Sequence, residues 1–170
     1  MSEYKRICIK GGTYFFTVKL ANKNQELLTQ YHRSLFSIFH KVKKQRPFRL
    51  NGWVVMPNHL HCIWTLPEDD SDYSGRWRLI KTAFTKYCRQ DSGLNEMPVW
   101  QARYWEHTIR NSADFKNHLD YIHYNPLKHG FVQRVMDWPF SSFQYYVSKG
   151  LYSKSWYGER QATDELYTGE

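Results

Sequence analysis

An alternation of side chains around His59-Leu60-His61 constrains the fold of this chain more than any other sequence feature. Apolar residues occupy every second position of the run, at Leu60, Cys62, Trp64 and Leu66. That period is typical of a β-strand, and it places His59 and His61 together on the opposite face. Their Cα atoms then lie roughly 6–7 Å apart, which suits two ligands of one metal ion. Such a pair also occurs as a structural feature, so metal binding depends on a third ligand elsewhere in the chain.

The histidine strand belongs to a longer series of strands and helices. Pro57-Asn58 is a turn signal that joins it to the preceding strand as a hairpin. We expect Asn24 to cap the first helix and Pro47 to end it. Asn111 or Ser112 should cap the third helix, and Pro126 should mark its end within a residue or two. The expected elements are strand 13–20, helix 25–46, strand 48–56, strand 59–66, helix 75–90, strand 99–110, helix 112–125 and a short helix near residue 143.

The order strand-helix-strand-strand-helix-strand is that of the split βαβ, ferredoxin-like plan within the α+β class. It predicts one antiparallel sheet with helices on one face. The length of 170 residues favours one domain with a proper core. We expect that domain over 1–150 and a polar C-terminal tail over 151–170.

Positive charge is concentrated at the start of the chain. Residues 1–60 hold 11 basic and two acidic side chains, a net charge of +9, whereas residues 61–170 hold 13 basic and 14 acidic ones, a net charge of −1. The densest run contains Lys41, Lys43, Lys44, Arg46 and Arg49. This asymmetry favours a polyanionic partner such as nucleic acid, although a solvated basic helix end gives the same pattern.

The sequence also predicts the compartment. No run approaches 18 apolar residues, and the N-terminal residues contain no apolar leader segment. The three cysteines, Cys8, Cys62 and Cys88, have no metal-type spacing and favour a reducing environment. We therefore expect a cytoplasmic protein without a membrane partner.

Tyr121 and Asn125 lie four residues apart on the third expected helix, so they share one face. If that helix packs across the histidine strand, two imidazoles, a carboxamide and a phenol meet. Such nitrogen and oxygen ligands are compatible with Mg²⁺ or Mn²⁺ beside a phosphate, and the phenol is a nucleophile. Each residue also has a simpler interpretation: Tyr121 as a packing residue and Asn125 as a helix cap before Pro126. Tyr124 would point about 100° away from Asn125, which favours Tyr121 as the nucleophile.

Over about residues 3–150 the chain resembles the REP-associated tyrosine transposases, a branch of the single-tyrosine HUH transposases. The resemblance lies in the stretches Trp53–Trp64, Trp100–Arg110, Asp120–Gly130 and Asp137–Ser142. It implies the HUH nuclease fold, with His59, His61 and Asn125 as metal ligands and Tyr121 as the nucleophile. Insertion-sequence relatives commonly carry glutamine where this chain has Asn125.

The resemblance also implies a substrate. Members of the family cleave and rejoin single-stranded DNA at REP hairpins that carry a 5′ tetranucleotide, through a 5′-phosphotyrosine intermediate. It further implies a bacterial protein at the nucleoid that works as a monomer or a homodimer. From glycine content and charge, the candidate DNA contacts are Lys10, Gly11, Gly12, Lys41, Lys43, Lys44, Arg46 and Arg103, the last of which could instead pair with Glu106.

Two other functions remain compatible with these residues. The basic first third and the abundant aromatic side chains would suffice for a non-catalytic protein that binds REP hairpins and regulates them. Alternatively, a metal-dependent hydrolase would use water in place of Tyr121, with Glu106 or His107 as its base.

Overall fold

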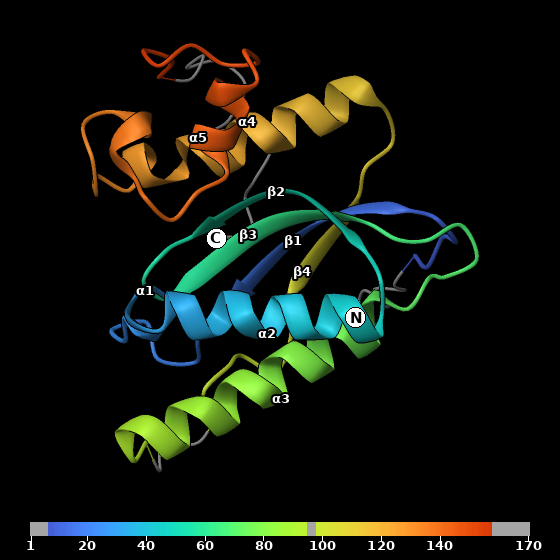
Figure 1. Ribbon diagram of the computed structural model, residues 1–170, viewed down its shortest axis with the longest axis vertical. Coiled ribbons are helices and arrows are strands. Elements are labelled where there is room, and N and C mark those ends of the chain that lie inside the picture. Colours follow the sequence, from blue (N-terminus) through green and yellow to red (C-terminus); the bar gives the residue numbers. More distant parts are fainter. Residues whose placement is uncertain (1–6, 95–97, 158–170) are drawn as a thin grey trace, which may run out of the picture.

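Four antiparallel strands in the order β2-β3-β1-β4 form the centre of the computed structural model, which describes residues 7–94 and 98–157 (Figure 1). The strands are β1 (Thr13–Lys19), β2 (Arg49–Val55), β3 (His59–Thr65) and β4 (Trp105–Thr108). β2 and β3 form the hairpin expected from Pro57-Asn58. β4 is shorter than the expected strand 99–110. In the part of that segment that precedes β4, Trp100 forms an isolated β-bridge to Leu20.

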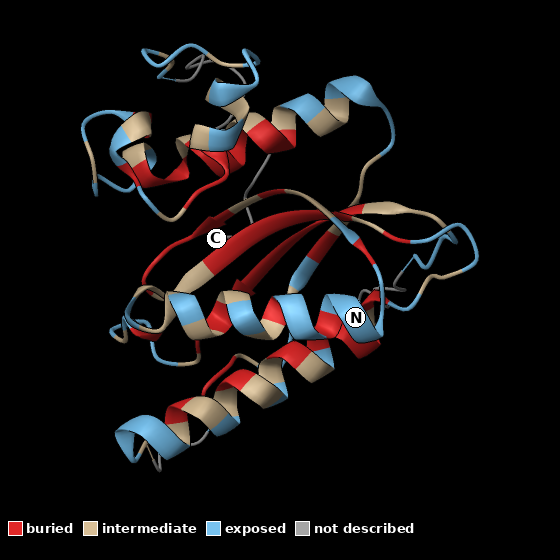
Figure 2. Cartoon of the chain, in the orientation of Figure 1, coloured by how far each residue is buried: buried red, intermediate tan, exposed pale blue. Residues whose placement is uncertain are grey.

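Helices α1 (Leu27–Gln30), α2 (His32–Gln45) and α3 (Tyr73–Ser92) follow β1 and β3, as the split βαβ plan requires. α2 and α3 lie on one face of the sheet (Figure 1). Their buried side chains meet the even-numbered residues of β1 and β3 in a core rich in aromatic rings, where the rings of Trp64 and Trp77 stack with centroids 4.5 Å apart. The outer surface of α2 is largely exposed (Figure 2). The predicted fold class is therefore confirmed.

The opposite face of the sheet is covered by α4 (Ser112–Lys128), so the expectation of helices on one face holds for α2 and α3 alone. α4 packs most closely on β2, where a Cβ atom added to Gly52 would come within 2.4 Å of Leu119 Cδ1. Glycine at this position permits the close approach of the helix. The 3₁₀ turn η1 (Val135–Asp137) and the helix α5 (Phe143–Ser148) complete this layer.

The start of the first helix differs from the expectation, whereas the two ends of α4 agree with it. Asn24 is not a cap, because its backbone N–H is bonded to Asn22 Oδ1 and the first helix begins only at Leu27 and breaks at Tyr31. Pro126 marks the end of α4 within two residues, as expected: the helix ends at Lys128, and the backbone N–H of His129 donates to Asn125 O. A proline this near the end of a helix costs few hydrogen bonds. The cap at Asn111 is as expected, since its side chain accepts from Asp114 N.

Packing continues past the expected domain boundary at residue 150. Tyr152 and Trp156 contact the Phe143 ring, and the Tyr152 hydroxyl donates to Asp120 of α4. The rest of the expected tail, residues 158–170, lies outside the described residues. None of the helices in the described ranges is both long enough and apolar enough to cross a membrane.

Candidate active site

β3 presents His59 and His61 on the face of the sheet that α4 covers. His61 is fully buried and His59 is half-buried. On the neighbouring strand β1, Thr17 pairs with His61 and Lys19 pairs with His59, so all four side chains emerge on one face. The rings of His59 and His61 have centroids 5.0 Å apart at 78°, which places two imidazoles side by side under α4.

Hydrogen bonds fix which nitrogen of each ring faces the site. Asn58 Nδ2 donates to Lys23 O, so Asn58 Oδ1 is the atom that lies 2.7 Å from His59 Nδ1. His59 must therefore donate from Nδ1, and its Nε2 carries the lone pair. Thr17 Oγ1 lies 2.8 Å from His61 Nδ1, so the Nδ1 atom of that ring is also engaged. Nε2 is thus the nitrogen of each ring that is left to face an ion.

α4 brings Tyr121 against this pair within one chain. The buried Tyr121 ring lies 5.2 Å from the His61 ring, edge-on, and both rings contact Phe15 at 6.0 and 5.6 Å. Lys128 Nζ lies 5.2 Å from the centre of the Tyr121 ring. The docking of the third helix over the histidine face, which the sequence pattern required, is therefore present.

Asn125 follows Tyr121 by one helical turn and is fully buried. Neither its Oδ1 nor its Nδ2 has a hydrogen-bond partner among the described residues. A buried carboxamide without partners is costly, so Asn125 is a candidate ligand for a group held under α4. Because Asn125 lies inside α4, its interpretation as a helix cap is wrong. Two imidazole nitrogens and this amide oxygen form a donor set that can hold a divalent cation.

His123 lies between Tyr121 and Asn125 in the sequence but points to another side of α4. Its Nε2 is 2.9 Å from Ser142 Oγ, and its ring packs against Phe143 and Tyr152. Burial lowers the pKa of His123 to about 3, so the ring stays neutral. His123 therefore ties α4 to the C-terminal layer and takes no part in the site.

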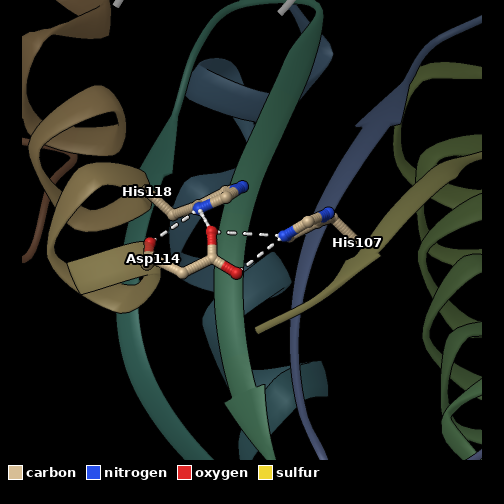
Figure 3. Close-up of side chains that lie close together, drawn as sticks. All are labelled: His107, Asp114 and His118. Atoms are coloured by element: carbon tan, nitrogen blue, oxygen red, sulfur yellow. Dashed lines mark hydrogen bonds and ion pairs between the residues drawn. The ribbon is translucent and has the colours of Figure 1, made fainter. Parts of the chain in front are cut away.

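A second polar group, His107, Asp114 and His118, joins β4 to the first turns of α4 (Figure 3). His107 Nε2 is 2.9 Å from Asp114 Oδ2, and His118 Nδ1 is 3.0 Å from Asp114 Oδ1 and 2.8 Å from Asp114 O. The two imidazole rings are nearly parallel, at 12°, with centroids 4.5 Å apart. An ion bound by both imidazoles would have to lie in the plane of each ring. These two rings are stacked, so their planes do not meet at a common position for an ion. We therefore interpret the group as a hydrogen-bonded clamp that uses Asp114 as its centre.

The clamp predicts a pH dependence of stability. Burial lowers the pKa of His118 to about 4, whereas an unfolded histidine titrates near 6.5. Stability from this group is therefore complete above pH 6.5 and is lost as pH falls towards 4, by on the order of 3 kcal/mol. Replacing His118 by glutamine should flatten the free energy of unfolding, measured in urea, between pH 6.5 and 4. An unchanged slope in His118→Gln would show that the ring is not held neutral.

Of the two candidate bases for a hydrolase, Glu106 does not lie at the candidate active site. Glu106 is buried on the α2/α3 face, where it faces Phe16 across the strands and contacts the Tyr73 hydroxyl at 3.5 Å. It is separated from the histidine pair by the sheet. His107 lies on the correct face but is engaged with Asp114.

The predicted DNA contacts fall in different places. Lys41, Lys43 and Lys44 are exposed on α2, on the face opposite Tyr121, and Arg46 pairs with Asp72. Gly11 has a φ of 67° and bonds to Pro67 O and Asp70 O, so it forms a turn against the loop after β3, next to the exposed Lys10 and the half-buried Gly12. Arg103 is exposed just before β4. The cations that accompany the histidine pair are Lys19, the register partner of His59, and Lys128, which sequence reasoning missed.

Comparison with known proteins gives consistent results. Residues 10–125 match the family model described as IS200-like transposase. The chain is 54% identical over 159 residues to the REP-associated tyrosine transposase of Escherichia coli K12, covering 94% of this chain and 93% of that one. It also matches the solved structure of a REP-associated tyrosine transposase bound to a REP hairpin, with a TM-score of 0.85, 50% identity and coverage of 99% of this chain and 100% of that one.

Proposed function

Because this chain belongs to the IS200-like transposases, and within them to the REP-associated tyrosine transposases, we propose that it cleaves and rejoins single-stranded DNA at REP hairpins through Tyr121. The observation that supports this most directly is the contact of the buried Tyr121 ring with His61. One helical turn further on, the Asn125 carboxamide has no hydrogen-bond partner within residues 7–94 and 98–157. A hairpin substrate is proposed because the similar solved structure is described as bound to a REP hairpin.

The proposed cofactor is Mg²⁺ or Mn²⁺, held by His59 Nε2, His61 Nε2 and Asn125 Oδ1. The fit rests on the fixed tautomer of His59 and on the buried amide of Asn125, which has no partner among the described residues. Such an ion, when bound, polarises the scissile phosphate and stabilises its developing charge. Asn58 and Thr17 orient the two rings from behind, as supporting residues of metal sites commonly do.

In the proposed reaction the Tyr121 hydroxyl oxygen attacks phosphorus, and the bond from phosphorus to the 3′ oxygen breaks. The products are a free 3′-hydroxyl and a 5′-phosphate joined to Tyr121. Attack by the 3′-hydroxyl of another strand reverses the step and releases the tyrosine, so strands are exchanged without ATP. Lys128, whose Nζ lies 5.2 Å from the centre of the Tyr121 ring, supplies positive charge beside the reacting phenol.

The site contains residues of one chain only, since Tyr121 and His61 meet within it. We therefore propose that a monomer is competent, with the REP hairpin and its 5′ tetranucleotide as the partner. A DNA-processing protein of this kind would work in the bacterial cytoplasm, at the nucleoid.

The test is a covalent-adduct assay with the full chain and an oligonucleotide that carries the palindrome flanking its gene. With Mg²⁺ or Mn²⁺ we expect a denaturation-resistant protein–DNA band and a released fragment that ends in a 3′-hydroxyl; with EDTA we expect neither. Tight binding without cleavage would favour the non-catalytic hairpin-binding protein. Cleavage without any adduct would favour the hydrolase that uses water.

A further inference from the structure

A cavity of about 270 Å³ opens beside His59, and we propose that it binds one unpaired nucleotide next to the scissile phosphate. This inference rests on the proposed strand-transfer reaction, because it takes His59 as part of the reacting centre. The cavity lies between the ends of β1 and β3 and the segment that follows α4. Its walls include Lys19, Lys23, Gln101, His129 and Phe131.

The register of the strands places the cavity against the candidate active site. Lys19 is the direct partner of His59 across β1 and β3, so both side chains stand side by side on the α4 face. The His129 ring lies 5.5 Å from the His59 ring, and the His129 backbone N–H donates to Asn125 O. A DNA strand whose phosphate reaches His59 can therefore place one adjoining nucleotide in this cavity.

The lining matches the phosphate and the base of a nucleotide. Lys19 and Lys23 supply positive charge for a phosphate, and none of the described residues that line the cavity carries a carboxylate. The Phe131 ring is 49% exposed, which leaves an aromatic face for a base to stack on. Gln101 offers an amide that can both donate to and accept from a base edge. The buried Leu20 forms an apolar floor.

The aromatic wall is held in place before any ligand arrives. The Phe131 backbone N–H donates to Pro126 O, and its ring lies 5.4 Å from the Trp138 ring. Trp138 Nε1 in turn donates to Val55 O on β2. A stacking surface fixed in this way loses little freedom on binding, which favours selective capture of one base. The size of the cavity restricts it to one nucleotide.

The test is a binding scan with REP-hairpin oligonucleotides, each with one abasic site in the unpaired 5′ segment, in EDTA so that no cleavage occurs. For the unaltered protein we expect one abasic position to raise Kd about tenfold, the effect of one lost stacking contact. Phe131→Ala should bind the intact probe about tenfold more weakly than the unaltered protein does. For this variant, the abasic site at that same position should cause no further rise in Kd. Tyr145→Ala, which removes another exposed ring, is the matched control and should behave as the unaltered protein.

Lys19→Gln provides a second, independent variant on β1. It should reduce the slope of log K against log salt by about one, the loss of one phosphate contact. The proposal is wrong if Phe131→Ala binds every probe with the affinity of the unaltered protein. It is also wrong if the loss of affinity caused by Phe131→Ala adds to the loss caused by each abasic position. Because the scan involves no chemistry, a protein that shows the expected pattern yet forms no adduct would refute strand transfer and leave the nucleotide pocket standing.

Discussion

Tyr121→Phe is expected to abolish the covalent protein–DNA adduct while the protein still folds and binds the hairpin. The change removes one oxygen atom and retains the ring that contacts His61 and Phe15. Loss of a nucleophile typically lowers the rate by more than about a thousandfold. The measurement is the initial rate of adduct formation on denaturing gels, with Kd for the hairpin determined in parallel in EDTA.

The neighbouring Tyr124 offers a matched control, because Tyr124→Phe removes the same atom three residues further along α4. We expect Tyr124→Phe to form the adduct at the rate of the unaltered protein. Adduct formation by Tyr121→Phe would show that another residue attacks phosphorus, and peptide mapping of the adduct would identify it.

Much of the fold was predictable because its signals are local. Alternation of apolar residues located β1 and β3, and it correctly separated Leu60 and Cys62 from His59 and His61. The turn at Pro57-Asn58 indicated β2 as the hairpin partner of β3. Asn111 indicated the start of α4, because its side chain caps the helix. Pro126 indicated the end of α4 to within two residues, because it falls within the last turn of the helix.

The candidate site was less predictable, because it depends on pairing between distant segments. Lys19 lies next to His59 only through a strand register that joins residues 40 positions apart. Charge density identified α2 as basic, yet nothing in the residues shows that α2 covers the face opposite Tyr121. His129 and Phe131 follow α4 in an irregular segment, where no periodicity indicates which way a side chain points.

The second large effect is expected from His61→Ala, which should remove both Mn²⁺ binding and adduct formation. His61 is the fully buried member of the pair, and its ring lies beside both His59 and Tyr121. Loss of one of three proposed ligands leaves too few donors for an ion. Isothermal titration with Mn²⁺, without DNA, measures binding separately from activity, and the adduct assay measures the consequence.

Thr17→Val distinguishes ligation from packing at the same ring. Valine retains the shape of Thr17 but removes the oxygen that holds His61 Nδ1, so Mn²⁺ affinity should fall by about 10- to 100-fold. Excess Mn²⁺ should then restore adduct formation in Thr17→Val but not in His61→Ala. Thr65→Val removes a hydroxyl elsewhere on β3 and should leave Mn²⁺ binding unchanged.

If His61→Ala folds and titrates with Mn²⁺ like the unaltered protein, the ion is held elsewhere. The buried carboxamide of Asn125 would then need a different partner.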